Sequence, residues 1–472
     1  KGSRMFKNFL GSITRNATSL AGTALALASI ILIVCLFFMQ QMGFEGGPYL
    51  GILTFLILPM LAILGLIMIP IGNLMWRRKV RKTPEGENVP ALPVFDLNQP
   101  HTRKWTLIFI AITTVNVVIL SGATYTGIHY MESTEFCGMA CHSVMQPEHT
   151  AHALGPHSRV SCAGCHIGPG ADWFVKSKLD GAWQLVSVNL GLYPKPIPTP
   201  LHDLRPARDT CEQCHWPTKF VGDRLKVIKH YKDDEANTEL TTALLLKVGG
   251  VNLTESHGIH WHVDPEHEIR YRSDETREEI YEVEFTDVDG SVKHYADRRA
   301  PEEGGMWRTM DCVDCHNRPA HNYQSPGNEV DRAMAEGLID RSLPFVKRES
   351  MRVIQENYPS HEEARAVMTA ELKQFYVDTY PDVASAQADA IDAAATALGD
   401  IYAANVFPSM EIWWDTYLNH IGHTQSAGCE RCHTRSMRTE EREQIDSDCE
   451  TCHVLLAEEE EDPQILSVLS GE

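Results

Sequence analysis

The chain has 472 residues, of which 43% are hydrophobic, so it can form two to four structural units and is too apolar to be disordered. Its 42 basic and 63 acidic residues give a formal net charge of −21, which excludes a non-specific nucleic-acid binder because phosphate binding needs a basic surface. The long apolar runs gather in residues 1–131, and the remainder is polar and acidic.

Three apolar stretches, at residues 20–39, 49–71 and 105–128, each reach the length of about 20 residues that a helix needs to cross a membrane. Three such runs so close together argue against buried core helices. The first run resembles a signal peptide, but no small-residue cleavage site follows it, so we interpret it as a retained helix. The loop after the second run is rich in Lys and Arg, which predicts a cytoplasmic loop and an exported chain after residue 131.

Twelve of the thirteen cysteines fall into six pairs, and five pairs have the sequence C-x-x-C-H. This pattern is the attachment motif of c-type haem, in which two thiols bond the porphyrin and the adjacent His is the proximal iron ligand. Zinc ribbons and redox dithiols also use C-x-x-C, but they do not require a His after every pair. The motif residues are Cys162, Cys165 and His166; Cys211, Cys214 and His215; Cys312, Cys315 and His316; Cys429, Cys432 and His433; and Cys449, Cys452 and His453.

The sixth pair, Cys137 and Cys141, has one extra residue between its cysteines and is followed directly by His142. Because every other pair is a haem motif, we interpret it as a haem site with an expanded loop. The sequence thus predicts six covalently bound haem c groups. The sixth pair closely follows the third apolar run, so we expect its haem at the membrane surface. The unpaired Cys35 lies within the first run and is interpreted as an apolar side chain.

A six-coordinate haem needs a second axial ligand, usually His or Met. The chain has 22 histidines, of which six belong to the motifs, so sixteen remain for bis-His coordination. Taken singly, each of these sixteen is as compatible with a surface or core role as with a ligand role. As a set, however, they must include several ligands. The candidate distal ligands are Met145, His152, His157, His202, His230, His260, His262, His321 and His423.

The pattern between the motifs predicts a fold that is mainly α with little regular sheet. Residues 280–285 and 292–295 alternate around Asp289-Gly290, which predicts a small β-hairpin insertion. Residues 328–418 are Ala-rich with helical periodicity, which predicts helices that space or cover the haems. The predicted organisation is a three-helix N-terminal membrane anchor at 1–131, followed by an exported multihaem cytochrome c domain. This domain divides into 132–216 with three motifs, 217–310 without haem, 311–428 with the fourth motif, and 429–472 with two motifs and an acidic tail.

The segment Ser133-Thr134-Glu135-Phe136-Cys137, followed by Cys141-His142 and the motif at Cys162, resembles the NapC/NirT/NrfH family of membrane-anchored quinol dehydrogenases, in its longer multihaem inner-membrane branch. The core of the resemblance covers residues 130–216. It implies oxidation of menaquinol or ubiquinol at the outer membrane face and electron delivery along the haems to an exported redox partner protein. Short members have one anchor helix and four haems, whereas this chain has three apolar runs and six motifs.

Two family features are altered in this chain. The usual first motif is C-x-x-C-H-x-M, with the Met as axial ligand of the quinol-side haem; Met145 is the nearest match, and Met139 inside the loop competes with it. The family's quinol pocket uses Lys and acidic residues after the second motif, where this chain has Lys176, Lys178 and Asp180. The alternative for these three residues is an amphipathic helix at the membrane surface.

The sequence therefore predicts a multi-pass protein of the inner (cytoplasmic) membrane with its haem domain on the periplasmic face. Its predicted partners are the lipid bilayer, the quinone pool and an exported redox protein, and association into an oligomer or complex stays open. One alternative is an electron-transfer subunit without its own quinol site, fed by a partner. A multihaem reductase is another alternative, but it needs an open iron, often marked by Lys in place of the motif His, and all six motifs keep His.

Overall fold

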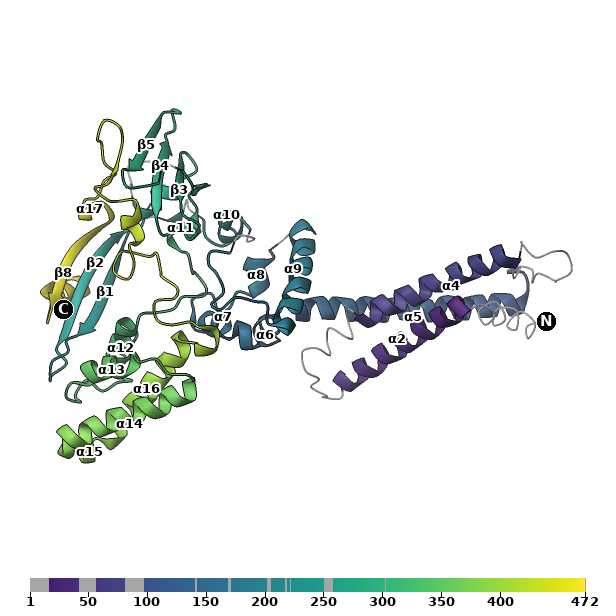
Figure 1. Cartoon of the computed structure of the whole chain (residues 1–472), viewed down its shortest axis with the longest axis horizontal. Helices are drawn as coiled ribbons and strands as arrows, with labels where there is room; N and C mark the ends of the chain where they lie inside the picture. Colours follow the sequence, from purple (N-terminus) through teal and green to yellow (C-terminus); the bar gives the residue numbers. More distant parts are fainter. Residues whose placement is uncertain are drawn as a thin grey trace. The chain divides into compact units, whose positions relative to one another are not determined.

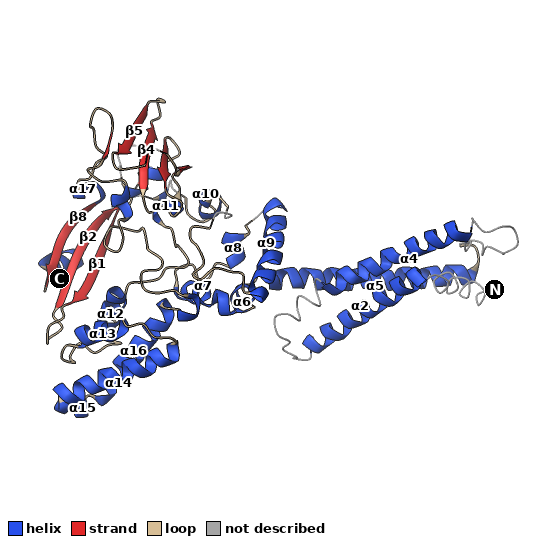
Figure 2. Cartoon of the chain, viewed as in Figure 1, coloured by secondary structure: helices blue, strands red, loops and turns tan. Residues whose placement is uncertain are grey.

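The computed structural model describes residues 17–41, 57–80, 97–140, 142–168, 171–201, 205–216, 219–220, 222–249, 258–301 and 303–471. The chain divides into two compact units, a first unit at residues 1–142 and a second unit at residues 143–472. Helices make up most of the regular structure, and the strands belong to two sheets in the second unit, as the colouring of Figure 2 shows.

The first unit contains three long helices, α2 (Ala17–Gln41), α4 (Leu58–Val80) and α5 (Pro100–Met131), and the short α6 (Thr134–Met139). Helices α2 and α4 pack closely because small residues line their contact. A Cβ placed on Gly22 would lie 2.6 Å from the carbonyl oxygen of Gly65, and the reverse distance is the same. The Ser19 hydroxyl also donates to the carbonyl of Ile69 at 3.0 Å. Small residues and hydroxyls at a helix contact are typical of helices that associate in membranes.

Two helices of the first unit are long and apolar enough to cross a membrane, through Ala17–Val34 of α2 and Leu58–Trp76 of α4. They are compatible with membrane anchoring. The predicted count of three spans is wrong, because among the described residues only these two helices qualify. Helix α5 does cover the third predicted run, but polar residues such as Thr106, Thr114 and Asn116 recur along it and dilute its apolar character.

The second unit contains two antiparallel sheets. The three-stranded sheet has the order β1-β2-β8 (Figure 1), and the five-stranded sheet has the order β6-β3-β4-β5-β7. The expectation of little regular sheet is therefore wrong, because strands far apart in the sequence complete both sheets and leave no local pattern. The strands are β1 (Asp223–Tyr231), β2 (Glu239–Lys247), β3 (Glu268–Ser273), β4 (Ile280–Thr286), β5 (Val292–Asp297), β6 (Met306–Thr309), β7 (Met437–Arg438) and β8 (His453–Glu460).

The predicted β-hairpin is confirmed as β4 and β5. Val283 pairs with Tyr295 and both side chains are buried, which agrees with the alternating pattern. The turn between the strands closes with the Asp287 amide donating to the Ser291 carbonyl at 2.9 Å. Gly290 in this turn has a φ of 82°, a conformation that glycine adopts at no steric cost.

The predicted helical stretch forms a lobe that carries no haem motif and is shown in Figure 1 in darker green (α12 and α13) and light green (α14 to α16). Its apolar faces enclose a core of side chains with no solvent exposure, including Leu343, Met368, Leu372 and Leu398. This lobe therefore has a side-chain core of its own. Its helices are α12 (Pro326–Ala335), α13 (Val346–Ile354), α14 (His361–Thr379), α15 (Pro381–Ala386) and α16 (Ala388–Asn405).

The remaining helices carry or flank the haem motifs and the chain's C-terminal part. They are mostly a single turn long, so the motif-bearing part of the unit is a series of short turns joined by loops. They are α7 (His142–Leu154), α8 (Cys162–His166), α9 (Ala171–Leu190), α10 (Ala207–Cys211), the 3₁₀ turn η3 (Ile259–Val263), α11 (Cys312–Cys315), η4 (Pro408–Met410), η5 (Gly428–Arg431), α17 (Cys449–Cys452) and α18 (Gln464–Ser470).

Candidate haem sites

The C-x-x-C-H motifs of the second unit form or adjoin single helical turns, which places the two thiols three residues apart on one side of the turn. In four motifs the amide of the His donates to the carbonyl of the first Cys, at 2.8 Å for His215, 2.8 Å for His316 and 3.1 Å for His433, and also for His453. The His is therefore held directly after the turn, on the side of the thiols.

Three of these turns begin with a side-chain cap. The Ser161 hydroxyl accepts from the Gly164 amide at 3.2 Å, and the Asp448 carboxylate accepts from the Glu450 amide at 3.1 Å. Asp311 and Asp314 form a capping box across the third turn. Such caps satisfy amides that a helix leaves without partners, so they stabilise turns that are too short to form alone.

The cysteine pairs follow one another in space in the order of the sequence. Burial raises the pKa of the Cys165 thiol, and the nearby Cys211 thiol raises it further. A hydrogen bond between Cys211 and Cys312 lowers the pKa of the first thiol and raises that of the second. The motifs beginning at Cys162, Cys211 and Cys312 are therefore neighbours.

The same contacts continue towards the C-terminus. Burial raises the pKa of Cys315 to about 11, with a further contribution from Cys429. Burial also raises the pKa of Cys452, and Cys429 is again the next cause. Five cysteine pairs thus form one continuous series through the second unit.

Each of the five motif histidines in this unit faces a second histidine from another part of the chain. Four of the pairs have nearly equal separations between ring centres. The pairs are His166 with His321 at 6.2 Å, His215 with His157 at 6.1 Å, His316 with His260 at 6.3 Å, His453 with His423 at 6.2 Å, and His433 with His262 at 5.6 Å.

These separations fit two imidazoles that share one metal ion. With each nitrogen about 2 Å from the metal and each ring centre about 1.1 Å behind its nitrogen, the two centres lie about 6.2 Å apart. The pair of His262 and His433 is shorter, with ring centres 5.6 Å apart and Nε2 atoms 3.4 Å apart, so these two rings would have to move slightly apart to share a metal ion. The residues at all five sites supply two imidazoles each, which is the donor set that a bis-His haem would need.

Hydrogen bonds fix the orientation of the partner rings. The Nδ1 atoms of His157, His260 and His262 lie 3.0, 2.7 and 2.8 Å from the backbone carbonyls of Pro319, Val248 and Ile259. His321 Nδ1 lies 3.0 Å from the carbonyl of Glu148. A ring that donates from Nδ1 leaves Nε2 available as a metal ligand, and such carbonyl partners are typical of ligating histidines.

Burial keeps several of these rings neutral. It lowers the pKa of His166, His262, His316 and His321, because their surroundings disfavour the charged imidazolium. Neutral imidazole is the form that binds a metal.

Other predicted ligands are not brought to a motif histidine in this way. The Nε2 atom of His152 lies 2.9 Å from the carbonyl of Val160 although its ring is 6.3 Å from that of His321. His230 Nε2 lies 3.9 Å from the carboxylate of Glu459. His202 and Cys141 lie outside the described residues, as does the side chain of His142. Met139 is 61% exposed on α6 and Met145 is half-buried on α7, so the distal ligand of the first motif stays a prediction.

The predicted quinol-site residues lie on α9. Lys176 and Asp180 are four residues apart and share one helix face, whereas Lys178 lies on another. Asp180 is exposed, and the Lys176 ammonium lies 5.1 Å from the centre of the Trp173 ring. Exposed apolar side chains border Asp180 at helical spacing, namely Leu179, Trp183, Val186 and Leu190.

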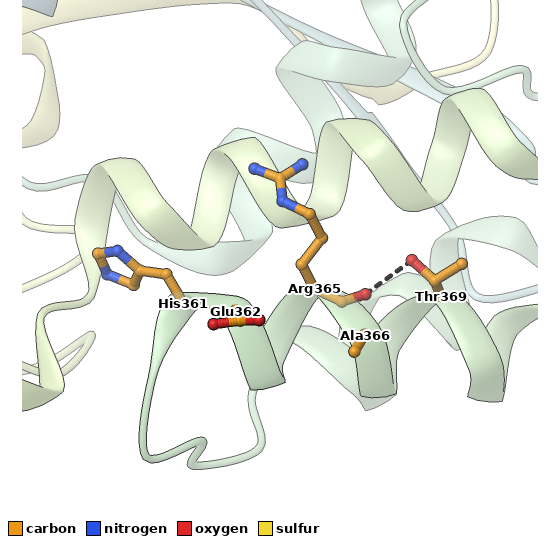
Figure 3. Close-up of a pocket in the computed structure, with 5 residues that line it drawn as sticks. All are labelled: His361, Glu362, Arg365, Ala366 and Thr369. Atoms are coloured by element: carbon orange, nitrogen blue, oxygen red, sulfur yellow. Dashed lines mark hydrogen bonds between the residues drawn. The ribbon is translucent and has the colours of Figure 1, made fainter.

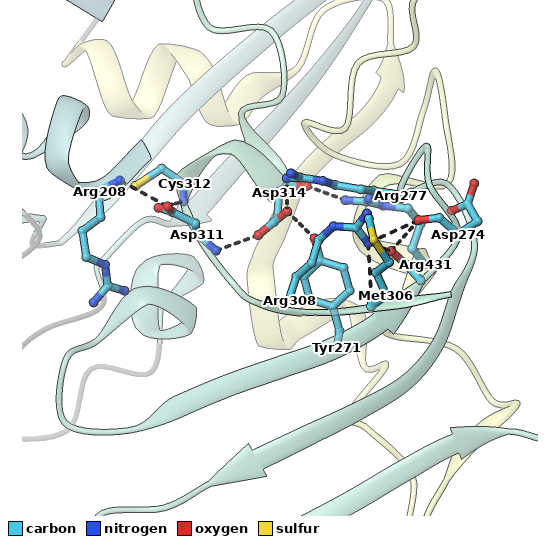
Figure 4. A network of polar contacts seen from close by, with 11 residues as sticks. Arg208, Tyr271, Asp274, Arg277, Met306, Arg308, Asp311, Cys312, Asp314 and Arg431 are labelled. Atoms are coloured by element: carbon cyan, nitrogen blue, oxygen red, sulfur yellow. Dashed lines mark hydrogen bonds and ion pairs between the residues drawn. The ribbon is translucent and has the colours of Figure 1, made fainter. Parts of the chain in front are cut away.

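Sequence reasoning missed a polar network that connects three motifs. Figure 4 shows one series of contacts that joins Arg208 near the Cys211 motif, Asp311 just before and Asp314 within the Cys312 motif, and Arg431 within the Cys429 motif. Arg208 and Asp311 are 103 residues apart in the sequence, and Asp314 and Arg431 are 117 residues apart. No local sequence pattern could therefore have indicated these contacts.

A surface hollow on α14, shown in Figure 3, is lined by residues that belong to no motif. His361 Nε2 lies 2.6 Å from the Val406 carbonyl, and the Thr369 hydroxyl donates to the Arg365 carbonyl at 2.7 Å. These contacts occupy the polar groups within the lobe, so we assign the hollow no role.

Among the described residues, no group of three or more His, Cys, Asp or Glu side chains is arranged to hold a metal ion. A structural zinc site needs four protein ligands.

Comparison with known proteins agrees with the haem interpretation. A family model described as the NapC/NirT cytochrome c family, N-terminal region, matches residues 99–192. The chain is also 42% identical over 442 residues to the cytochrome c-type protein ImcH of Geobacter sulfurreducens, covering 92% of this chain and 86% of that protein. The chain belongs to the NapC/NirT cytochrome c family. This NapC/NirT-type cytochrome is accordingly a multihaem c-type cytochrome of electron transfer with covalently bound haem c. No solved structure matches it.

Proposed function

We propose that this cytochrome binds six haem c groups, oxidises a membrane quinol and passes the electrons to an exported acceptor protein. The observation that carries the proposal is the series of five cysteine pairs, each with two facing histidines, in sequence order through the second unit. Haem c, when bound, supplies a one-electron carrier at each of these positions. The chain's own residues hold these carriers in a row.

The proposed axial pairs are the five histidine pairs of the second unit. Each pair would supply two nitrogen ligands to the iron of its haem, so these five positions would leave no open iron for a substrate. This arrangement favours electron transfer over the multihaem reductase alternative. For the sixth site we propose Cys137, Cys141 and His142 with Met145 or Met139 as the distal ligand, and a Met ligand would raise its reduction potential.

We place the quinol-side groups on α9. Oxidation of one quinol releases two electrons and two protons, so a base must accept protons where the quinol binds. Asp180, with Lys176 on the same face and Lys178 nearby, is the proposed group. The exposed stripe of Leu179 and Trp183 beside Asp180 suits a helix that lies in the membrane interface, where Trp is favoured and quinol is available. The amphipathic-helix alternative thus becomes part of the same proposal.

For localisation we propose a multi-pass anchor in the inner membrane, with the haem-bearing residues on the periplasmic face. The apolar α2 and α4 support the anchor, and covalent haem attachment on the outer side of the membrane supports the orientation. The menaquinol or ubiquinol pool and an exported redox protein are the proposed partners, in keeping with the family.

The test is reduction of the purified holoprotein by a menaquinol analogue. We expect Asp180→Asn to slow quinol oxidation at least tenfold while all haems remain and are still reduced by dithionite. The matched control is Asp382→Asn on α15, an exposed carboxylate of the helical lobe, which should keep the wild-type rate. Wild-type rates in both Asp180→Asn and Lys178→Met would place the quinol site elsewhere. Reduction of the wild type only in the presence of a partner protein would instead favour the electron-transfer subunit.

A further inference from the structure

One 3₁₀ turn serves two different motifs. In η3, His260 faces His316 at 6.3 Å between ring centres with the planes only 7° apart, and His262 faces His433 at 5.6 Å. A 3₁₀ helix has about three residues per turn, so side chains two residues apart point to different sides. The segment His260-Trp261-His262 therefore reaches the Cys312 motif with one ring and the Cys429 motif with the other.

The same two motifs are also joined on their cysteine side. Asp314 lies between Cys312 and Cys315 and is only 3% exposed. Its carboxylate pairs with the Arg277 guanidinium at 2.9 Å and accepts from the Tyr271 hydroxyl and, at 2.6 Å, from the Asp311 amide (Figure 4). This carboxylate is thus a buried charge held in one position by three donors.

Arg431 completes the connection from the other motif. It lies between Cys429 and Cys432 and donates to the carbonyls of Asp314 at 2.5 Å and of Arg277 at 2.6 Å. A guanidinium that donates to carbonyl acceptors on two segments fixes their relative position more strictly than a single hydrogen bond does. Arg431 therefore ties the second motif to the charged pair beside the first.

The surroundings of these charges are poorly hydrated. The Asp314 side chain is 5% exposed and the side chain of its partner Arg277 is 22% exposed. The charged groups beside the two motifs are therefore largely removed from water. In such surroundings a charge acts more strongly on its neighbours than it does in water.

We propose that the motifs Cys312–His316 and Cys429–His433 form one two-haem redox unit whose geometry is fixed by Arg431. In this unit Asp314 lowers both reduction potentials and Arg431 raises both. The inference rests on the proposed haem binding and goes beyond it. A buried negative charge stabilises the oxidised, more positive haem and lowers its potential, and a positive charge raises it. Both residues are positioning and tuning residues and do not exchange electrons.

The test is a potentiometric titration of the holoprotein with dithionite, followed by haem-resolved spectra. In Asp314→Asn, two of the midpoint potentials should rise together; in Arg431→Met, the same two should fall together. The other potentials should keep their wild-type values in both variants. The control is Arg435→Met, an exposed cation just after His433 and outside the network, which should move no potential because water and salt screen it.

Shifts of opposite sign on the same two haems support the proposal, since a merely structural role would not change sign with charge. A shift of one potential, of none, or of more than two overturns it. If Asp314→Asn does not assemble with haem, Arg431→Met alone decides by the same criterion. Quinol is not needed in the titration, and haem counting on the wild type tests haem binding separately, so failure of either part of the proposed function is recognised independently.

Discussion

Replacing His321 by Ala should convert one haem of the six from low-spin to high-spin. The ring of His321 lies 6.2 Å from that of His166, with its Nδ1 held by Glu148 and its Nε2 left for the metal. Removing the ring leaves His166 as the only axial ligand, because the nearby His152 ring directs its Nε2 to the Val160 carbonyl.

The fold should tolerate this change. When His321 is lost, Glu148 keeps its ion pair with Arg318, whose Nη2 lies 3.0 and 3.2 Å from the two carboxylate oxygens. Arg318 in turn stacks on the Tyr417 ring at 4.0 Å from its centre. The polar loss is the contact of His321 Nδ1 with the Glu148 carbonyl at 3.0 Å and with the Glu148 carboxylate at 3.1 Å, which together cost about 1–2 kcal/mol. Haem content and thermal stability should therefore stay close to the wild type, and the change should be confined to coordination.

The assay is electron paramagnetic resonance with optical spectra of the oxidised protein. One sixth of the low-spin signal should be replaced by a high-spin signal in His321→Ala. The matched control is His152→Ala, whose ring is 6.3 Å from that of His321 but bonded to a carbonyl, and which should keep six low-spin haems. A high-spin signal in His152→Ala, or none in His321→Ala, would refute the assignment of axial pairs.

Four further outcomes are expected. The denatured protein should carry six haem masses and give a c-type pyridine haemochrome; five would contradict the expanded motif at Cys137. A protease added to the outer membrane face should cleave beyond residue 131 and spare residues 77–104, and the opposite pattern would reverse the proposed orientation. Cys315→Ser should lower the yield of folded protein, because its motif relies on bound haem. Leu398→Ala in the helical lobe should lower the free energy of unfolding in denaturant by about 2–5 kcal/mol without changing the haem spectra.

The cysteine spacing indicated the chemistry of the site because a covalent motif is local in sequence. The axial pairing was not predictable in the same way. His152 and His157 both follow the first motif, yet only His157 faces a motif histidine, and its Nδ1 partner is Pro319, 162 residues away. Five of the nine candidate ligands face motif histidines, and which five depends on tertiary contacts.

In the fold, too, local features were predictable from the sequence and long-range contacts were not. The hairpin at β4 and β5 has a local turn and alternating strands, so its pattern was visible in the sequence. Strand β8 was hidden because its acidic second half resembled a solvated tail, and its partner β2 is remote. The third apolar run was overcounted because length alone did not weigh the polar residues along α5.

The pairing of β2 with β8 has a consequence for the order in which the protein matures. Lys247 at the end of β2 donates to the carbonyl of Glu450, 203 residues later. As the chain is synthesised, β1 and β2 emerge long before this partner, so until it arrives their sheet is a two-stranded hairpin, which is marginally stable unless it packs on other elements. Strand β8 begins at His453, the last residue of its motif, so the third strand joins at the point in synthesis where the final pair of thiols becomes available. Closure of this sheet and loading of the last cofactor are thereby events of the same late stage.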